Sequence, residues 1–392
     1  SLIGPVMNLF IEPLLCLWAL PCGLLAVPLI PLAPEVAQLL LQAGQPGIRL
    51  ALWLTDAVAG LPYASLWTAT PHPVEIIVFI CILILWLLPR PTVARRTVAW
   101  GLALLLTGSF TYPLWSAKKE RELTVSYLDV GQGAATLVQL PDGTDILIDG
   151  GGYQSEQFDT GQNLIGPFLW HKRIWRLHDL IITHPHLDHY SGLPFITERF
   201  RPRRVIVNGD AGEDSSYTRL LHLAEQKGAT LHTAHSGELI HQGHDFTFTC
   251  LGMNGLPIIN APPLTTNDRS LVFRLQSGEH SFLFPADIGL ASEHLLIRND
   301  LNLRADVLLA PHHGSLSSAG QTFLEQVNPK LIVVSASQRR QGFLPAPEHL
   351  RQWHQKKIPV LVTGQDGTIN CISDGKTLSA NAFSGVTYHF GR

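Results

Sequence analysis

The distribution of apolar residues divides the chain into two parts. From Leu2 to Ala33 the only charged residue is Glu12, and prolines recur throughout this stretch. A bilayer-spanning helix needs about 20 apolar residues, so we expect here one kinked helix or a broken pair. Residues 34–62 carry polar side chains at helical intervals, which predicts an amphipathic helix lying along a membrane surface. Residues 74–88 and 97–115 are the clearest predicted membrane spans.

Beyond Arg121 the pattern changes to short β-branched runs separated by glycine, aspartate and proline. Strands follow one another directly at first, and later they alternate with helical patterns such as residues 217–228. This order is typical of an α/β sandwich. The change in pattern places the domain boundary near Ala117, with an all-α transmembrane region at residues 1–116 and an α/β domain at residues 117–392.

Charge adds two constraints on this picture. The net charge of −3 gives no global basic signature, so any contact with nucleic acid must come from local patches. Equal numbers of arginine and lysine residues flank the two sides of the predicted hairpin, so the positive-inside rule does not orient it. The chain starts without methionine or a basic segment typical of a signal peptide, and we expect an upstream part to be missing.

Candidate metal ligands follow an apolar run in the stretch ITHPHLDHYSG, residues 182–192. His184 and His186 are two positions apart, so in an extended segment both imidazoles can point to one side. Asp188 and His189 then turn toward a second point nearby. This is the geometry for two adjacent metal ions that keep open positions for water and substrate.

Two more predicted strand ends carry residues of the same kind. Asp287 follows the run SFLFP, where a single carboxylate can bridge two ions, and His312 and His313 follow the run VLLAP. Three sets of ligand residues at strand ends are far more specific than any one set alone.

These residues resemble the metallo-β-lactamase superfamily, whose hallmark is H-x-H-x-D-H followed by an aspartate and a histidine at later strand ends. The resemblance implies an αββα sandwich with a dinuclear site at one edge of its sheets. It assigns His184 and His186 to the first metal, Asp188 and His189 to the second, and Asp287 to a bridge. One of His312 and His313 would complete the second site, and the other would contact the substrate or protonate the leaving group.

The chain departs from that family pattern at one position. Typical hydrolases of the superfamily supply another histidine between the first cluster and the bridging aspartate. His235, His241 and His244 are candidates here, and the segment TTNDRS offers Asn267 and Asp268 as possible ligands of metal or substrate instead. Fewer imidazole ligands favour manganese over zinc, with zinc as the alternative. A water held between two such ions becomes a nucleophile near neutral pH, so hydrolysis is the expected reaction.

The stretch YLDVGQGAATLVQLPDGTDILIDGGG resembles the ComEC-type DNA internalisation channels, which also carry segments like NDRS and PHHGS in this order. That resemblance places Asp129 and Gln132 beside the metal site, where they join Asp188 and His312 as residues expected to take part in catalysis. It implies a multi-pass protein of the inner membrane that takes up one DNA strand, with an extracytoplasmic nuclease domain that degrades the other. The expected partners are DNA, membrane lipid and other DNA-uptake proteins.

Local basic groups are the candidate DNA contacts, because lysine and arginine neutralise backbone phosphates. They are Lys172, Arg173, Arg176, Arg201, Arg203 and Arg204. Two other functions stay open. One is a membrane-tethered hydrolase of a cell-surface ester or phosphodiester, and the other is a non-enzymatic domain that only guides DNA.

Overall fold

The computed structural model describes residues 3–61, 64, 67–89, 92–115, 122–131, 133–152, 158–212, 214–252, 254–256, 263–337 and 344–391. Packing divides the chain into two compact units, Ser1–Thr68 and Ala69–Arg392. The predicted boundary at Ala117 lies outside the described residues and stays a prediction.

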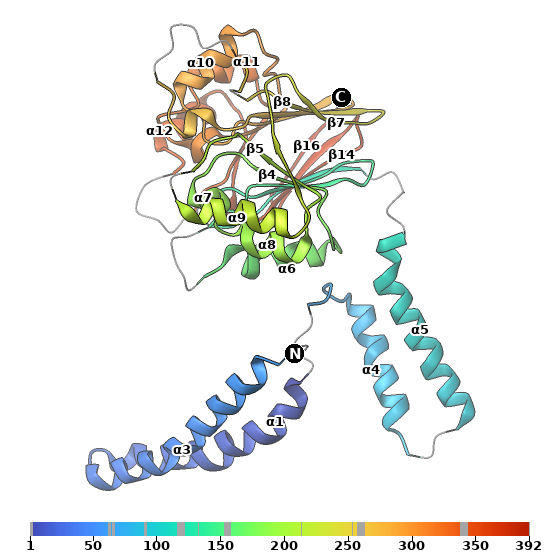
Figure 1. The fold of residues 1–392 in the computed structure, drawn as a ribbon, viewed down its shortest axis with the longest axis vertical. Helices are drawn as coiled ribbons and strands as arrows, with labels where there is room; N and C mark the ends of the chain where they lie inside the picture. Colours follow the sequence, from blue (N-terminus) through green and yellow to red (C-terminus); the bar gives the residue numbers. More distant parts are fainter. Residues whose placement is uncertain are drawn as a thin grey trace. The chain divides into compact units, whose positions relative to one another are not determined.

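The first unit is a pair of helices (Figure 1). Its first helix is continuous from Gly4 to Leu29, and α3 (Pro34–Ala59) is the second. Prolines supply no N–H group to the helical ladder, and the first helix changes its hydrogen-bond pattern where they recur. It consists of α1 (Gly4–Glu12), a π-helical segment (Pro13–Ala19), α2 (Leu20–Ala26) and a 3-10 turn (Val27–Leu29). Residues Gly4–Leu29 therefore form one distorted helix and not a broken pair.

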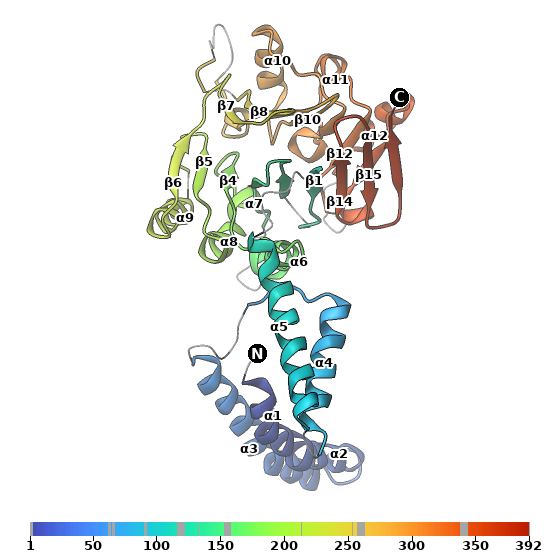
Figure 2. The same ribbon diagram turned by 90° about the vertical axis from the view of Figure 1, so that its right-hand side faces the viewer.

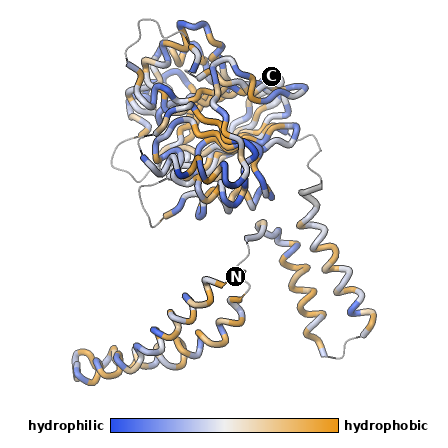
Figure 3. Tube along the Cα trace, in the orientation of Figure 1, coloured by the Kyte–Doolittle hydropathy of each residue, from blue (hydrophilic) through white to orange (hydrophobic). Residues whose placement is uncertain are grey.

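Small residues bring these two helices together. A β-carbon at Gly44 would lie 3.0 Å from Cys22 Cβ, and one at Gly47 would lie 3.0 Å from Leu14 O. Close packing through glycine is typical of helices within membranes. Large apolar side chains such as Leu9 (74%) and Leu17 (78%) are exposed, and Figure 3 shows the apolar character of this pair. Among the described residues, Gly4–Leu29 is the one helix long and apolar enough to cross a membrane.

The second unit begins with a hairpin of two helices, α4 (Pro73–Leu87) and α5 (Val93–Trp115). Trp86 and Trp100 pack edge to face across it, with ring centroids 5.9 Å apart. Both helices lie where the sequence predicts membrane spans. With 15 residues, α4 is shorter than the roughly 20 that a straight span requires.

Two mixed β-sheets follow the hairpin and pack face to face (Figure 2). Over the described residues, the first sheet has the strand order β16-β15-β14-β1-β2-β3-β4-β5-β6 and the second the order β13-β12-β11-β10-β9-β8-β7. The strands of the first sheet are β1 (Leu123–Tyr127), β2 (Thr136–Gln139), β3 (Asp145–Ile148), β4 (Asp179–Ile182), β5 (Arg204–Val207), β6 (Thr230–Thr233), β14 (Ile369–Ser373), β15 (Leu378–Ala382) and β16 (Thr387–Phe390). Those of the second are β7 (Leu239–Gln242), β8 (Phe246–Cys250), β9 (Phe273–Ser277), β10 (His280–Phe284), β11 (Val307–Leu309), β12 (Leu331–Val334) and β13 (Val360–Val362).

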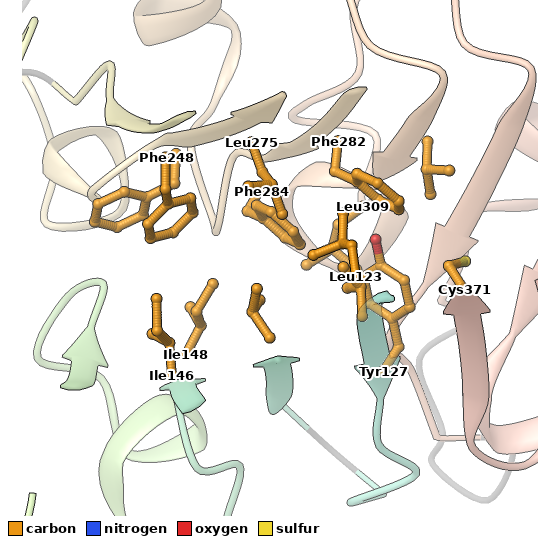
Figure 4. Packing of buried hydrophobic residues seen from close by; sticks show 14 of the residues in the cluster. Leu123, Tyr127, Ile146, Ile148, Phe248, Leu275, Phe282, Phe284, Leu309 and Cys371 are labelled. Carbon is orange, nitrogen blue, oxygen red and sulfur yellow. The ribbon is translucent and has the colours of Figure 1, made fainter. Parts of the chain in front are cut away.

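Helices cover the outer faces of both sheets (Figure 1). The first sheet is covered by α6 (Gly166–His171), α8 (Leu193–Phe200) and α9 (Ser215–Gln226), and the second by α10 (Leu290–Arg298), α11 (Gln321–Val327) and α12 (Pro347–Gln355). One apolar layer lies beneath the helices on each outer face. A third lies between the sheets and includes Phe248, Phe284 and Ile148 (Figure 4). The predicted αββα sandwich is confirmed.

Strand direction brings the polar strand ends to one edge. β3, β4 and β5 run parallel, and all four residues of β4 are buried. In the second sheet β10, β11 and β12 also run parallel. Residues that follow β4, β10 and β11 therefore leave their sheets at carboxyl ends, which is where sites form in such folds.

Replacing Phe284 by alanine tests the inter-sheet core. Its side chain is 2% exposed, and its ring centroid lies 6.3 Å from that of Tyr127 and 6.4 Å from that of Phe248. We expect Phe284→Ala to lower the free energy of unfolding by about 3–5 kcal/mol, measured by urea denaturation of the detergent-solubilised chain with near-UV circular dichroism. Phe383→Ala is the matched control, because this side chain is 88% exposed. Equal midpoints for the two variants would contradict the assignment.

Candidate metal centre

Four side chains meet at the shared edge of the two sheets. They are Asp188, His189, Asp287 and His313, called here the ligand cluster, and one ligand atom of each lies within 4.8 Å of the others. His189 Nε2 is 3.3 Å and His313 Nε2 is 3.4 Å from Asp287 Oδ2. His313 Nε2 is also 3.5 Å from Asp188 Oδ2. The three segments come from the ends of β4, β10 and β11, as the sequence predicts.

Both histidines of the ligand cluster have the hydrogen bonding that a metal ligand needs. His189 Nδ1 is 2.7 Å from Asp149 Oδ2, and His313 Nδ1 donates to Ser335 O at 2.8 Å. The Nε2 atom of each ring is buried and has no hydrogen-bond partner among the described residues. Metal-bound histidines typically hold one ring nitrogen on a carboxylate or carbonyl and direct the other at the ion. The residues present therefore fit a divalent metal.

The backbone around the ligand cluster adopts left-handed conformations that non-glycine residues rarely take. The φ angles of Asp149, Ala286, His312 and His313 are 58°, 51°, 47° and 55°. Each such residue costs on the order of 1–3 kcal/mol and persists only where its surroundings fix it. The chain therefore bends sharply after three strands, and these bends direct side chains toward one point.

His184 and His186 form a second group beside the ligand cluster. His184 Nε2 lies 3.1 Å from His186 Nδ1, and the ring centroids of His184 and His189 are 4.2 Å apart. Burial lowers the pKa of His184 well below its usual value, and the nearby His189 adds to this effect. A neutral imidazole is the form that binds metal. His184 is therefore held in the form that binds metal, and His186 lies beside it.

Charge coupling within the ligand cluster is strong. Burial alone would raise the pKa of Asp188 and lower that of His313. The opposite charges outweigh burial, so the pKa of Asp188 falls well below its usual range and the pKa of His313 rises to about 10. The pKa of His189 is raised in the same way, by the carboxylates of Asp287 and Asp149. The metal-free cluster thus holds protons that a metal ion must displace.

His312 differs from His313 in its surroundings. Its Nε2 atom lies 4.0 Å from Asp287 Oδ2, its side chain is 30% exposed, and its Nδ1 atom is 3.1 Å from Ser317 Oγ. Asn267 Nδ2 lies 3.4 Å from His312 Nε2, and Asn267 Oδ1 is buried without a hydrogen-bond partner among the described residues. His313 therefore belongs to the ligand cluster, while His312 and Asn267 border it.

Asp268 has a supporting position. Its carboxylate accepts hydrogen bonds from Thr265 Oγ1 (2.7 Å), Gly289 N (3.2 Å) and Ser292 Oγ (3.2 Å). These bonds tie the segment before β9 to the start of α10, just after Asp287. The structure brings Asp268 near the metal centre as a brace for the Asp287 loop.

The glycine-rich loop after β1 lies against the ligand segment through its backbone. Gly133 has φ of 95°, a β-carbon there would collide with Asp188 O, and its carbonyl accepts a hydrogen bond from Ser335 Oγ at 2.9 Å. Asp129 is exposed, and its carboxylate accepts from Gly131 N at 3.2 Å. Gln132 lies outside the described residues. A catalytic role for Asp129 and Gln132 stays a prediction.

The three histidines considered as an extra ligand lie elsewhere. His241 Nε2 contacts Asp179 Oδ2 at 2.5 Å at the start of β4, the end remote from the ligand cluster. His244 Nδ1 contacts its neighbour Asp245, and His235 is exposed and bonded to Glu238 through its backbone.

The basic candidates for DNA contact also lie at the start of β4 and β5, not at the metal edge. Arg204 makes two contacts with Asp179, at 3.0 and 2.6 Å, and Arg173 contacts Glu75 of α4 at 2.5 Å. Arg204 and Arg173 are thus neutralised by carboxylates, which argues against a phosphate role for either. The other four candidates are Lys172, Arg176, Arg201 and Arg203.

Two residues that support the site could not be found from the sequence, Thr183 and Ser335. Each directly follows a buried strand, and each holds a histidine through a hydrogen bond: Thr183 Oγ1 lies 3.1 Å from His184 Nδ1, and Ser335 O accepts from His313 Nδ1 at 2.8 Å. Their signal was a single polar residue after an apolar run, which is common in any α/β sheet. Their importance becomes evident only when the strands are ordered in space.

An αββα sandwich with a cluster of histidines and aspartates at its edge is the arrangement found in metal-dependent hydrolases. Residues 128–337 match the metallo-beta-lactamase superfamily, and the chain belongs to it. Residues 1–92 match the competence protein family.

Relatives carry the same two parts. The chain is 27% identical over 387 residues to ComE operon protein 3 of Bacillus subtilis, covering 94% of this chain and 48% of that protein. It is 29% identical over 364 residues to competence protein ComA of Neisseria gonorrhoeae, covering 91% and 45%. The chain thus spans about half the length of these curated relatives.

Two solved structures are similar at low TM-scores. Zn²⁺-bound PqqB of Methylobacterium extorquens is 12% identical with a TM-score of 0.42, covering 62% of this chain and 99% of that one. The diiron β-hydroxylase CmlA of Streptomyces venezuelae is 16% identical with a TM-score of 0.33, covering 60% and 49%.

Metal binding should release protons. Because the raised pKa values of His189 and His313 keep both rings protonated near pH 7 without metal, we expect metal affinity to rise with pH toward about pH 10. The raised pKa of these rings also stabilises the metal-free fold fully below about pH 6.5, the unfolded value, and that contribution is lost as pH rises. Titration calorimetry in buffers of different ionisation enthalpy measures the released protons. Affinity that does not change between about pH 6.5 and about pH 10, the interval in which the raised pKa of His313 keeps its ring protonated without metal, would contradict this.

Gly133→Ala should disturb the ligand segment without removing a ligand side chain. The added methyl group collides with Asp188 O, and the positive φ disfavours alanine. We expect metal affinity to fall about tenfold or more, as for the loss of a group that orients a ligand. The control is Gly255→Ala, where φ is also positive but nothing lies within 4 Å. Equal metal affinities of the two variants would show that close approach at Gly133 does not hold the ligand segment.

Proposed function

We propose that the chain is the metal-dependent nuclease portion of a DNA-uptake channel, hydrolysing phosphodiester bonds of the strand that is not transported. The observation that carries the chemistry is that the buried Nε2 atoms of His189 and His313 both face the carboxylate of Asp287, at 3.3 and 3.4 Å, with Asp188 beside them. The observation that carries the biological setting is the match of residues 1–92 to the competence protein family.

The chemistry follows from the arrangement of the ligand cluster. Two bound divalent ions would activate a water molecule and neutralise charge developing on a phosphoryl oxygen. Asp188, His189, Asp287 and His313 would hold one ion, and His184 with His186 would hold the other. Two carboxylates in the cluster suit manganese, although two imidazoles also suit zinc. Phosphodiesters suit such a site because their transition states carry extra negative charge.

His312 is positioned to act on the substrate. Its side chain is partly exposed, its Nδ1 atom has a hydroxyl partner in Ser317, and its Nε2 atom faces Asn267 and Asp287. An imidazole held in this way can give a proton to a leaving oxygen or bind a phosphoryl oxygen. Asn267 would orient the ring and offer its own amide to the same oxygen.

The membrane setting is part of the same proposal. The apolar helix Gly4–Leu29 and the hairpin α4–α5 would lie in the inner membrane, with the sandwich on its extracytoplasmic side. DNA and other uptake proteins would be its partners there.

A metal-dependent cleavage assay on the full chain in detergent tests this function. We expect cleavage of DNA with added manganese. We expect Asp188→Ala and His189→Ala to lose both metal and activity, by about a hundredfold or more, because each removes a direct ligand. His312→Gln should keep the metal and lose turnover by about a hundredfold. His222→Ala is the matched control, since that ring is 69% exposed on α9.

Each alternative function has its own outcome in this assay. Hydrolysis of a small phosphodiester without cleavage of single- or double-stranded DNA would favour the tethered hydrolase of a surface polymer. DNA binding without hydrolysis of any ester would favour the guiding role. Cleavage that persists after metal loss in Asp188→Ala would overturn the metal mechanism.

A further inference from the structure

The basic residues singled out in the sequence lie at the end of the sheet remote from the metal. β4 and β5 run parallel from Asp179 and Arg204, and Arg203 N donates to His178 O at that starting end. Asp188 and His189 of the ligand cluster follow the opposite end of β4. Four residues of strand separate the two ends, about 13 Å at roughly 3.3 Å per residue. We call Lys172, Arg176, Arg201 and Arg203 the basic edge.

A buried ion pair attaches this edge to the apolar hairpin. Arg173, next to Lys172, contacts Glu75 Oε2 at 2.5 Å, and the two side chains are only 11% and 7% exposed. The Arg173 guanidinium also donates to Ser109 O at 3.4 Å and lies 5.1 Å from the Phe110 ring centroid. Glu75 accepts a further hydrogen bond from the Ser109 hydroxyl.

These contacts locate the basic edge relative to the hairpin. Glu75 belongs to the first turn of α4, and Ser109 and Phe110 belong to the last two turns of α5. Arg173 therefore joins both helices at one end of the hairpin. Its own φ of 58° is a left-handed value that arginine rarely adopts, and the surrounding contacts hold it there.

The charges of the basic edge are open to a ligand. Arg176, Arg201 and Arg203 are exposed, and none has a carboxylate oxygen within 4 Å among the described residues. Arg176 Nε donates to Arg201 O at 3.1 Å, which holds the two basic segments side by side. Arg204, just beyond them, is occupied by Asp179.

We propose that the basic edge binds the anionic lipid headgroups of the membrane that holds the hairpin. Lysine and arginine next to a membrane-inserted segment are attracted by the negative surface potential of anionic lipids. The ion pair at Arg173 keeps that edge at the hairpin end, where headgroups lie. Attachment to the apolar hairpin favours lipid over DNA, because it places this edge beside the predicted membrane spans. The metal centre then faces away from the lipid, open to DNA from the aqueous side.

Arginine modification in nanodiscs tests the contact on the full chain, without metal or DNA, so its result is independent of nuclease activity. Phenylglyoxal labelling is read residue by residue by mass spectrometry, in phosphatidylcholine discs and in discs that also contain phosphatidylglycerol. We expect phosphatidylglycerol to slow labelling of Arg176, Arg201 and Arg203 roughly fivefold each, an effect that high salt reverses. Arg351, with a 67% exposed side chain on α12, is the control and should not change.

A paired variant separates this surface from general lipid effects. In Arg201→Gln/Arg203→Gln, the protection of Arg176 by phosphatidylglycerol should be lost, while Arg351→Gln should leave it intact. Unchanged labelling in both kinds of disc would overturn the proposal. Protection by a single-stranded oligonucleotide but not by phosphatidylglycerol would also overturn it and assign the edge to DNA. Persistent protection of Arg176 in the double variant would be a third contradiction.

Discussion

The metal centre depends on the hydrogen bonds that the buried carboxylate of Asp149 makes to Thr183 and His189. Its Oδ1 atom accepts the Thr183 N–H group at 2.9 Å, and its Oδ2 atom accepts the Thr183 hydroxyl at 2.8 Å. The same Oδ2 atom lies 2.7 Å from His189 Nδ1. One buried residue at the end of β3 thus fixes the backbone just before His184 and the ring orientation of His189. A carboxylate that is 1% exposed is costly to bury unless it is fully bonded, so the three bonds also explain why it is tolerated.

The sandwich supplies the other half of the arrangement. Asp149, Thr183 and His189 follow strands of the first sheet, whereas Asp287, His313 and Ser335 follow strands of the second. The apolar layer between the sheets holds these two groups within reach of each other. Left-handed backbone at Asp149, Ala286 and His313 turns the chain at three strand ends. Backbone strain is therefore concentrated at the turns that orient the ligands. The buried strands that precede these turns hold the strained backbone in place.

The sequence predicts the fold for a specific physical reason. An apolar run followed by histidine or aspartate indicates a buried strand with a candidate metal ligand at its end. The spacing H-x-H-x-D-H is specific to this kind of site. The choice of His313 over His312 as a ligand could not be predicted, because both follow the same strand and their difference lies in Ser335, 22 residues away. The extra histidine ligand expected from the family pattern was equally undetermined. His241 has the right residue type, yet its strand in the second sheet brings it to Asp179 instead.

The basic residues along the sequence were the least informative guide to function. Arg173, Arg204 and Arg201 look alike along the sequence, and all three were candidates for DNA. In the structure Arg204 is held by a carboxylate of its own sheet, Arg173 is held by a carboxylate of the hairpin, and Arg201 is exposed. Because β4 has basic residues at its start and metal ligands at its end, one short strand separates two surfaces of different character. A fold that attaches one end of this strand to apolar helices leaves its other end free, which is the arrangement that the proposed function requires.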